Sequence, residues 1–334
     1  MTNAETDKAR RLLCRMQETI RDTVLQARRR QGLALTRVAA VTAADTIYQV
    51  DKVSEAAIMA WFEENWPRTW PVELVMEGLE DEAEPATFPR GTPVSKTHFK
   101  CIIDPIDGTR NLMYDKRSAW VLSGLAPQRG KRNHLGDILV AAMTEIPTSR
   151  QDRSDQFSAL RGGPLQGRTR DLRTGGTRPL RTQPSQAGDF RHGFASVVKF
   201  FPEGKTLAAH LEEQLWARLH GAGAGGSPVI FDDQYISTGG QLYELIVGHD
   251  RMIADLRPLV FAKLGLPREL VCHPYDICTA LLLEAAGGVI HHADGKRLRS
   301  PLDTTSPVDW IGYANPRLAR LAGPVLRDLC RELL

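Results

Sequence analysis

The chain has 334 residues, of which 42% are hydrophobic and 25% charged, enough for one large core or for two subdomains that share a core. Its formal net charge of +3 creates no field strong enough to predict nucleic-acid or membrane binding. The five scattered cysteines lack metal-ligand spacing, which favours reduced thiols. No apolar run approaches the ~20 residues of a membrane span, and the basic N-terminus has no apolar core. We therefore expect a cytoplasmic protein.

Two helices are predicted at the start of the chain. The first, over residues 7–30, is amphipathic, and its apolar face contains Leu12, Leu13, Met16, Ile20 and Val24. Its opposite face is rich in arginine, which favours a solvated helix face over a nucleic-acid contact. The second helix, over residues 54–66, follows Asp51, which stands where a helix cap is expected.

The next predicted strands end in acidic residues. Leu74 to Met76 reads as a strand with Glu77 at its end. Residues 101–103 read as a buried strand that must end at Asp104, because Pro105 holds Asp104 out of the α region. Both Asp104 and Asp107 therefore lie at the mouth of this strand. A turn at Gly108 then leads through Thr109 into a short helix, whose free N–H groups face the same mouth and favour phosphate.

Two further strands, over residues 118–125 and 137–146, are expected to neighbour the strand that ends at Asp104. The following residues, 150–191, contain nine arginines. They could form a nucleic-acid arm, but they lack interleaved aromatic side chains on which bases would stack. We therefore expect an exposed hairpin and linker.

The second half of the chain alternates helices and strands, as in an α/β layer. A helix is predicted over residues 206–219, and a glycine-rich break follows at residues 221–226. Residues 236–240, which include Gly239 and Gly240, precede a helix over 241–247. A strand over 252–254 ends at Asp255, close to Arg257, and Asp276 stands before a further apolar helix.

The hexapeptide Asp104 to Thr109, DPIDGT, resembles the signature of the inositol monophosphatase family. This family lies within the wider group of magnesium-dependent, lithium-sensitive phosphatases. Further matching segments lie at residues 50–55, 75–78, 274–280 and 284–289, and the resemblance extends roughly from Leu35 to the C-terminus. It implies a layered αβαβα sugar-phosphatase fold of the α/β class. We expect an α+β subdomain over residues 1–190, which carries the main metal site, and an α/β subdomain over 191–334, which closes the active site.

The resemblance also implies a magnesium site. Its ligands would be the carboxylates of Glu77, Asp104, Asp107 and Asp276 together with the carbonyl of Ile106. Oxygen ligands suit Mg²⁺, no Cys or His cluster competes for a softer metal, and converging carboxylates without cations would repel one another. Taken singly, Asp107 could belong to an ordinary turn and Asp276 could cap a helix.

The resemblance implies roles for further residues. Thr109 and Asp51 would orient the attacking water and help to deprotonate it, with Glu77 beside them. The predicted substrate-binding residues are Gly108, Thr109, Gly239, Gly240, Asp255, Arg257 and Asp276. The histidines show no catalytic spacing and are set aside.

The expected substrate is a small polyol or sugar monophosphate, and the expected assembly is a homodimer without nucleic-acid or membrane partners. Gly239 and Gly240 would leave room for a ring, whereas Arg257 could instead bind a second phosphate. Residues 258–273 look like an insertion relative to typical members. The alternatives are a phosphatase of the 3′-phosphoadenosine-phosphate or fructose-1,6-bisphosphate type, a non-catalytic metal-binding protein, or a nucleic-acid-binding protein.

Overall fold

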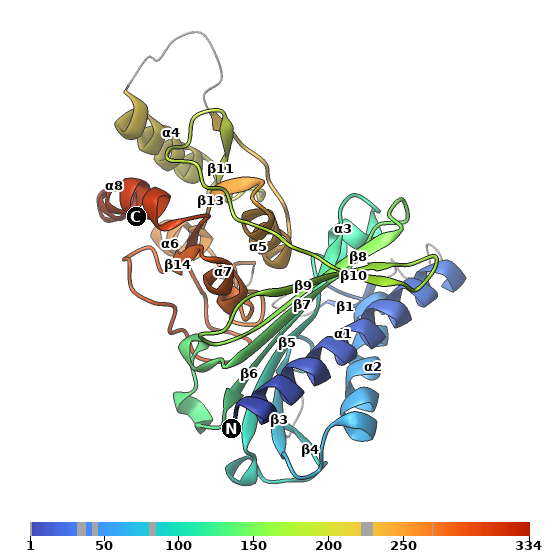
Figure 1. Cartoon of the computed structure of the whole chain (residues 1–334). Helices are drawn as coiled ribbons and strands as arrows, with labels where there is room; N and C mark the ends of the chain where they lie inside the picture. Colours follow the sequence, from blue (N-terminus) through green and yellow to red (C-terminus); the bar gives the residue numbers. More distant parts are fainter. Residues whose placement is uncertain (1, 32–37, 42–45, 80–84, 222–229, 269) are drawn as a thin grey trace.

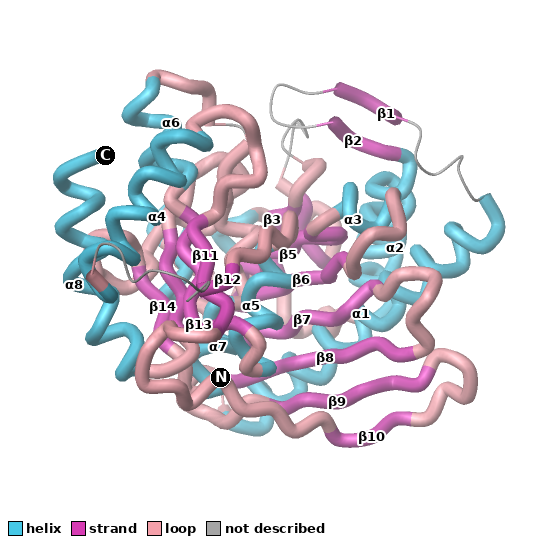
Figure 2. The backbone as a smooth tube through the Cα atoms, turned by 90° about the horizontal axis from the view of Figure 1, so that it is seen from above, coloured by secondary structure: helices cyan, strands magenta, loops and turns pink. Residues whose placement is uncertain are grey.

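The computed structural model describes residues 2–31, 38–41, 46–79, 85–221, 230–268 and 270–334. The predicted glycine-rich break and the acidic loop after Glu77 lie largely outside these residues. Within the described part, helices and strands alternate in five layers, which Figures 1 and 2 show from two directions. From one side to the other these are a helix pair, an eight-stranded sheet, a second helix pair, a five-stranded sheet and a final helix layer. The predicted αβαβα fold is confirmed.

The first sheet has the strand order β10-β9-β8-β7-β6-β5-β3-β4. Its strands are β3 (Val72–Met76), β4 (Ala86–Phe88), β5 (Phe99–Asp107), β6 (Ala119–Pro127), β7 (Val140–Ile146), β8 (Arg153–Leu160), β9 (Gln166–Asp171) and β10 (Thr177–Pro179). All neighbours are antiparallel except β3 and β5. Helices α1 (Asn3–Gln31) and α2 (Gln49–Asn65) cover its outer face (Figure 1). The apolar stripe of α1 is fully buried there, as its 3.6-residue period predicts.

The second sheet has the order β12-β11-β13-β15-β14. Its strands are β11 (Gly193–Val197), β12 (Ile230–Phe231), β13 (Asp250–Asp255), β14 (Val289–His291) and β15 (Trp310–Tyr313). Helices α5 (Thr238–Val247) and α7 (Ala280–Ala286) contact strands of both sheets and form the central layer. Helices α4 (Lys205–His220), α6 (Arg257–Leu264) and α8 (Pro316–Leu333) form the outer layer (Figure 2).

The smaller elements lie between α1 and α2 or between strands of the first sheet. They are the ribbon of β1 (Val38–Val41) and β2 (Thr46–Tyr48), helix α3 (Thr109–Met113), and 3₁₀ turns at Val94–Lys96, Gly130–Arg132 and Leu135–Asp137. The division at residue 190 falls between β10 and β11, and the subdomain boundary stays a prediction. No helix of the described residues is long and apolar enough to cross a membrane.

The arginine-rich stretch forms a hairpin, as predicted, but the expectation that it is exposed is wrong for its first strand, because most of β8 is buried. Strands β8 and β9 pair in antiparallel fashion, and β10 adds to the edge of β9. Several of the arginines meet acids: Arg168 lies 2.8 Å from Glu18, and Arg173 lies 3.2 Å from Asp152. These ion pairs compensate part of the positive charge that the sequence concentrates here.

Among the boundaries that differ from the sequence prediction, four concern the acidic residues and the glycine-rich helix start. Strand β5 does not end at Asp104 but continues to Asp107, with an irregularity in its pairing to β6 between these two residues. Helix α2 begins at Gln49, so Asp51 lies in its first turn rather than before it. Helix α5 begins at Thr238, three residues earlier than predicted. Helix α7 begins only at Ala280, so Asp276 lies in the preceding turn and does not cap the helix.

Candidate active site

Three carboxylates meet between the two sheets. Asp104 and Asp107 come from the end of β5, and Asp276 comes from the turn before α7. Each offers one oxygen, and these oxygens lie within 4.8 Å of one another. Asp104 is 1% exposed and Asp107 is 6% exposed. The irregularity in β5 brings this about, because Asp104 and Asp107 would point to opposite faces of a regular strand.

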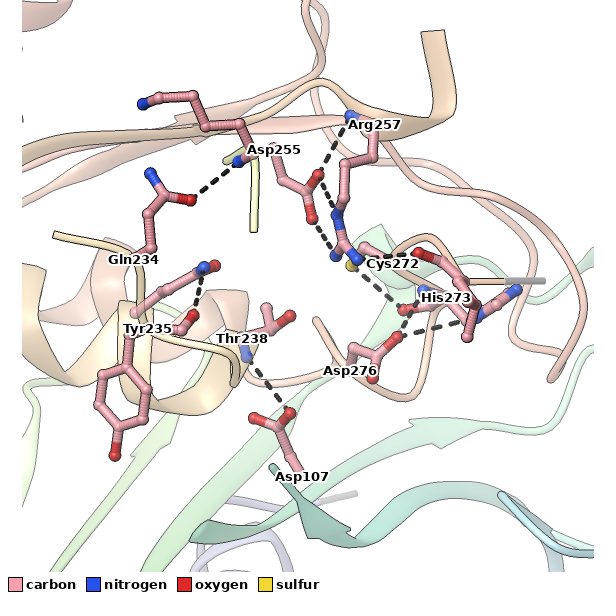
Figure 3. Close-up of polar contacts among 12 residues, drawn as sticks. Asp107, Gln234, Tyr235, Thr238, Asp255, Arg257, Cys272, His273 and Asp276 are labelled. Atoms are coloured by element: carbon pink, nitrogen blue, oxygen red, sulfur yellow. Dashed lines mark hydrogen bonds and ion pairs between the residues drawn. The ribbon is translucent and has the colours of Figure 1, made fainter. Parts of the chain in front are cut away.

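Asp107 is held by the first turn of α5. Its carboxylate accepts hydrogen bonds from the Ser237 hydroxyl at 2.7 Å, from the Thr238 N–H at 3.2 Å and from the Gly239 N–H. Figure 3 shows the bond from Thr238 to Asp107. Free N–H groups at a helix start stabilise such a negative charge. A Cβ at Gly239 would lie 2.9 Å from Asp107 Oδ2 and 2.7 Å from Leu122. Glycine therefore lets the helix approach the carboxylate.

Burial raises the pKa of all three carboxyl groups, and repulsion from neighbouring carboxylates adds to the shift of Asp104 and Asp276. For Asp104, burial is the largest cause, and the charges of Glu77, Asp107 and Asp276 add to it. Burial likewise raises the pKa of Asp107 to about 6, although its three hydrogen bonds oppose the shift. The pKa of Asp276 is raised well above 3.8 by burial and by the charge of Asp107.

The carboxylates of Asp104, Asp107 and Asp276, called the trio from here on, therefore fit a divalent cation. Among the described residues, no Lys or Arg lies within salt-bridge distance of Asp104, Asp107 or Asp276. A bound cation would relieve their repulsion, and the three carboxylate oxygens suit a hard ion.

Glu77 and Ile106 border the same cleft as the trio. Glu77 follows β3, the strand that pairs with β5, but it does not belong to the group of three close oxygens. The N–H of Ile106 donates to Asp104 Oδ1 at 3.0 Å, and its carbonyl accepts from the Thr109 hydroxyl at 2.9 Å. A carbonyl has two lone pairs, so that of Ile106 can still bind an ion.

Thr109 and Asp51 lie in contact although 58 positions separate them. The Thr109 hydroxyl lies 3.1 Å from Asp51 Oδ1, and helix α3 begins at this threonine. Gly108 precedes it with a φ of +88°, and a Cβ there would lie 2.9 Å from the Cβ of Ser237. The single hydroxyl proton of Thr109 can serve only one acceptor at a time, which leaves its oxygen free to accept a hydrogen bond from water.

At the other end of the cleft, Arg257 is bound by Asp255. Its Nε and Nη2 donate to the two oxygens of Asp255 at 2.9 and 2.6 Å (Figure 3). Its Nη1 donates to the carbonyl of Leu270 at 2.9 Å, and its Cζ lies 4.6 Å from the centre of the Phe200 ring. Asp255 is fully buried. The arginine therefore borders the cleft with its charge already matched.

Three of the predicted substrate-binding residues have other neighbours than expected. Asp255, Gly239 and Gly240 are not among the residues that line the cleft. Asp255 accepts hydrogen bonds from Arg257, and the N–H of Gly239 donates to Asp107. A Cβ at Gly240 would lie 2.3 Å from the ring of Tyr235. The two glycines thus make room for protein groups, while Gly108, Thr109, Arg257 and Asp276 do line the cleft.

The structure adds residues that the sequence analysis missed. The cleft contains about 740 Å³ of empty space, including its mouth, and its further lining residues include Phe200, Phe201, Leu270, Val271, His273 and Tyr275. His273 had been set aside with the other histidines. The backbone N–H of His273 donates to Asp276 Oδ2 at 2.6 Å, and the His273 ring stacks on Tyr275 with the ring centroids 5.5 Å apart. Its position three residues before Asp276 was the available signal.

No family model and no curated protein matches the sequence. Solved structures do match over nearly the whole chain. The extragenic suppressor protein SuhB from Bartonella henselae has a TM-score of 0.63 at 14% identity, with 97% of this chain and 98% of that chain covered. An inositol monophosphatase from Zymomonas mobilis has a TM-score of 0.58 at 15% identity, with 98% and 99% covered.

The likeness extends beyond the monophosphatases. A fructose-1,6-bisphosphatase from Leishmania major has a TM-score of 0.60 at 14% identity, with 96% of this chain and 93% of that chain covered. At such identities the comparisons show the fold, which is the one these sugar phosphatases share. The fold that the DPIDGT resemblance implied is therefore confirmed.

Proposed function

We propose that this protein is a magnesium-dependent phosphomonoesterase, which hydrolyses a small polyol or sugar monophosphate to an alcohol and inorganic phosphate. The observation that carries the proposal is the buried trio Asp104, Asp107 and Asp276, which has raised pKa values and no described Lys or Arg within salt-bridge distance. A purely structural cluster of this kind would destabilise the fold. The shared fold with inositol monophosphatases supports the assignment.

Glu77, Asp104, Asp107, Asp276 and the carbonyl of Ile106 would hold the metal. When bound, magnesium supplies positive charge that neutralises the phosphate and acidifies a nearby water. Thr109 and Asp51, which lie 3.1 Å apart, would orient that water and take its proton, with Glu77 close by. The water oxygen bonds to phosphorus, the ester P–O bond breaks, and the leaving oxygen takes up a proton. Asp276 can also accept a hydrogen bond from a hydroxyl beside the ester.

A monophosphate is favoured over a bisphosphate as the substrate because of Arg257. This residue was the candidate for binding a second phosphate, but both of its paired nitrogens already face Asp255. A second phosphate bound through these two nitrogens would have to displace that buried carboxylate. Phosphatases of the 3′-phosphoadenosine-phosphate or fructose-1,6-bisphosphate type remain the alternative to be tested.

Other parts of the proposal rest on the family resemblance. We infer a cytoplasmic homodimer that is inhibited by lithium and binds no nucleic acid. Light scattering of the full chain tests the dimer. A titration with generic oligonucleotides at low and high salt tests the last point, because binding through arginines would weaken steeply with salt.

A phosphate-release assay over a panel of phosphomonoesters tests the activity. We expect turnover with magnesium, none after chelation, and recovery when magnesium is restored. Asp107→Asn removes a ligand charge without changing volume and should abolish turnover. The matched control is Glu213→Gln on the exposed face of α4, which should behave like the parent protein. Full turnover by Asp107→Asn, or by the metal-free protein, would contradict the proposal.

A further inference from the structure

Beyond the carboxylates, the walls of the cleft are aromatic and aliphatic. Phe200 and Phe201 follow β11, and their ring centres lie 4.9 Å apart. Leu270, which is 40% exposed, and the stacked rings of His273 and Tyr275 come from the segment before α7. All five side chains line the cleft that contains the metal-binding trio. Of these, Phe200, Phe201 and Leu270 stay at least partly accessible and are available to a ligand, whereas His273 and Tyr275 are only 5% and 9% exposed.

The polar side chains beside these aromatic walls mostly form hydrogen bonds within the protein. Arg257 donates to Asp255 and to the carbonyl of Leu270. The Ser237 hydroxyl donates to Asp107 and accepts from the N–H of Gly240. A polyol that entered here would lose hydrogen bonds to water, and few protein groups could replace them. Each unpaired hydroxyl would weaken binding.

One buried acceptor is an exception. Gln241 lines the cleft, is 3% exposed and donates through Nε2 to the carbonyl of Tyr235 at 2.8 Å. Its Oε1 is buried and has no hydrogen-bond partner in the part of the chain that the structure describes. Buried acceptors are normally satisfied. Gln241 therefore carries an unsatisfied acceptor beside the cleft.

We propose that the alcohol released by this enzyme carries a flat aromatic or heteroaromatic ring. Because the Phe200 and Phe201 rings lie at 73° to each other, this ring would stack on one of them and meet the edge of the other. The inference rests on the proposed phosphatase activity and narrows its substrate class. A sugar monophosphate that carries a nucleobase lies within the proposed class and has this chemistry, and an arylalkyl phosphate serves as the simplest probe of it. The wall selects the flat ring because aromatic side chains stack on planar groups better than on puckered ones.

The test compares two phosphate esters that differ only in the flatness of their ring. Benzyl phosphate and cyclohexylmethyl phosphate have similar size, and each releases a primary alcohol. With the full chain and magnesium, we expect kcat/KM to be about tenfold higher for the benzyl ester, as one stacked ring allows. A second comparison, of ribose 5-phosphate with adenosine 5′-monophosphate, asks whether the ring is a nucleobase.

Variants then locate the preference. Phe200→Leu and Phe201→Leu keep an apolar side chain but remove the ring, and each should reduce the ratio of the benzyl to the cyclohexylmethyl rate severalfold. The matched control is Phe231→Leu, an exposed aromatic outside the cleft that packs against Phe194 at 5.6 Å. This control should keep the parent ratio. Circular dichroism shows whether each variant is folded.

The outcomes separate this inference from the activity on which it rests. Glycerol 2-phosphate carries no ring and serves as the reference substrate. If no ester, including this one, is hydrolysed with magnesium, the proposed phosphatase function fails and the inference fails with it. If glycerol 2-phosphate is hydrolysed while the benzyl and cyclohexylmethyl esters have equal kcat/KM, the function stands and the ring preference is overturned. The wild-type comparison decides this even if a phenylalanine variant does not fold.

Discussion

Two groups of buried charge lie beside one cleft, and they are built in opposite ways. Asp104, Asp107 and Asp276 bring three like charges together without a salt bridge to Lys or Arg within the described chain. Asp255 and Arg257 form a bidentate pair in which each charge is matched. The first group raises its own pKa values and leaves its charge for a ligand, whereas the second group is satisfied by the protein itself. Buried charge thus marks a functional site only where its partner is missing.

The largest expected effect separates function from stability in the trio. Asp104→Asn should lower kcat/KM by about a thousandfold, because a metal ion contributes several kcal/mol of transition-state stabilisation. In chelator, the same variant should be more stable than the parent by about 0.5–2 kcal/mol, since it removes a repelled buried charge. Phosphate release and urea denaturation measure the two effects. A variant that lost activity and stability together would show that the trio is structural.

The paired group should respond in the opposite sense. Arg257→Met leaves Asp255 buried without a partner and should destabilise the fold by about 3–5 kcal/mol. Adding Asp255→Leu removes the orphaned charge and should restore most of that loss, as urea denaturation would show. The control is Arg331→Met, which breaks an exposed pair with Asp328 and should cost at most about 0.5 kcal/mol. A double variant no more stable than the single one would contradict the pairing.

A smaller effect is expected at Thr109 and Asp51, which would orient and deprotonate the attacking water. Thr109→Ala should lower kcat by about ten- to a hundredfold and change KM little, because orientation acts in the transition state. Asp51→Asn should behave alike, and steady-state kinetics of both single variants and the double variant form the test. If the two residues act as one unit, the double variant loses little more than either single one. Losses that multiply would separate their roles.

The smallest expected effect comes from a matched pair outside the cleft. His292 Nδ1 lies 3.3 Å from Asp309 Oδ1. Burial opposes the charged histidine, but the hydrogen bond and charge of Asp309 raise the pKa of His292 above 6.5. Burial likewise opposes the carboxylate, yet His292 lowers the pKa of Asp309 below 3.8.

These shifts set a pH window. The contribution of His292 is complete below pH 6.5 and is lost as the pH rises through its raised pKa; that of Asp309 is lost as the pH falls through its lowered pKa. His292→Gln should therefore cost about 0.5–1 kcal/mol near pH 5.5 and less at pH 9, while kcat stays unchanged. Denaturation at the two pH values measures this. An equal loss at both would show that packing, not charge, is involved.

The closeness of Asp104, Asp107 and Thr109 could be predicted from the sequence, because these residues lie within six consecutive positions. Asp276 comes from a distant segment, and only the family resemblance grouped it with them. The order of the layers was implied by the resemblance that the DPIDGT segment carries, whereas the apolar periods alone predicted only an alternation of helices and strands in the second half of the chain. The irregularity in β5 was not visible, because Pro105 suggested a strand end where the chain only changes its pairing.

The aromatic wall of the cleft could not be predicted from the sequence, because its contacts join distant segments of the chain. Phe200 and Phe201 lie in an ordinary apolar stretch, and only the fold brings them to the cleft. Gly239 was expected to make room for substrate, but it makes room for the carboxylate of Asp107, which comes from 132 positions earlier in the chain. Arg257 was read as a free cation, although the spacing Asp255-Leu256-Arg257 was the clue to its partner.

The contact between Asp107 and α5 has a consequence for the dynamics of the protein. The amide hydrogens of Thr238 and Gly239 point at this carboxylate instead of at a helix carbonyl. They can exchange with solvent deuterium only when the first turn of α5 separates from the end of β5. The exchange rate of these two amides therefore reports how often the central helix layer detaches from the first sheet. A cation that fixes Asp107 should slow both amides together and leave the far end of α5 unaffected.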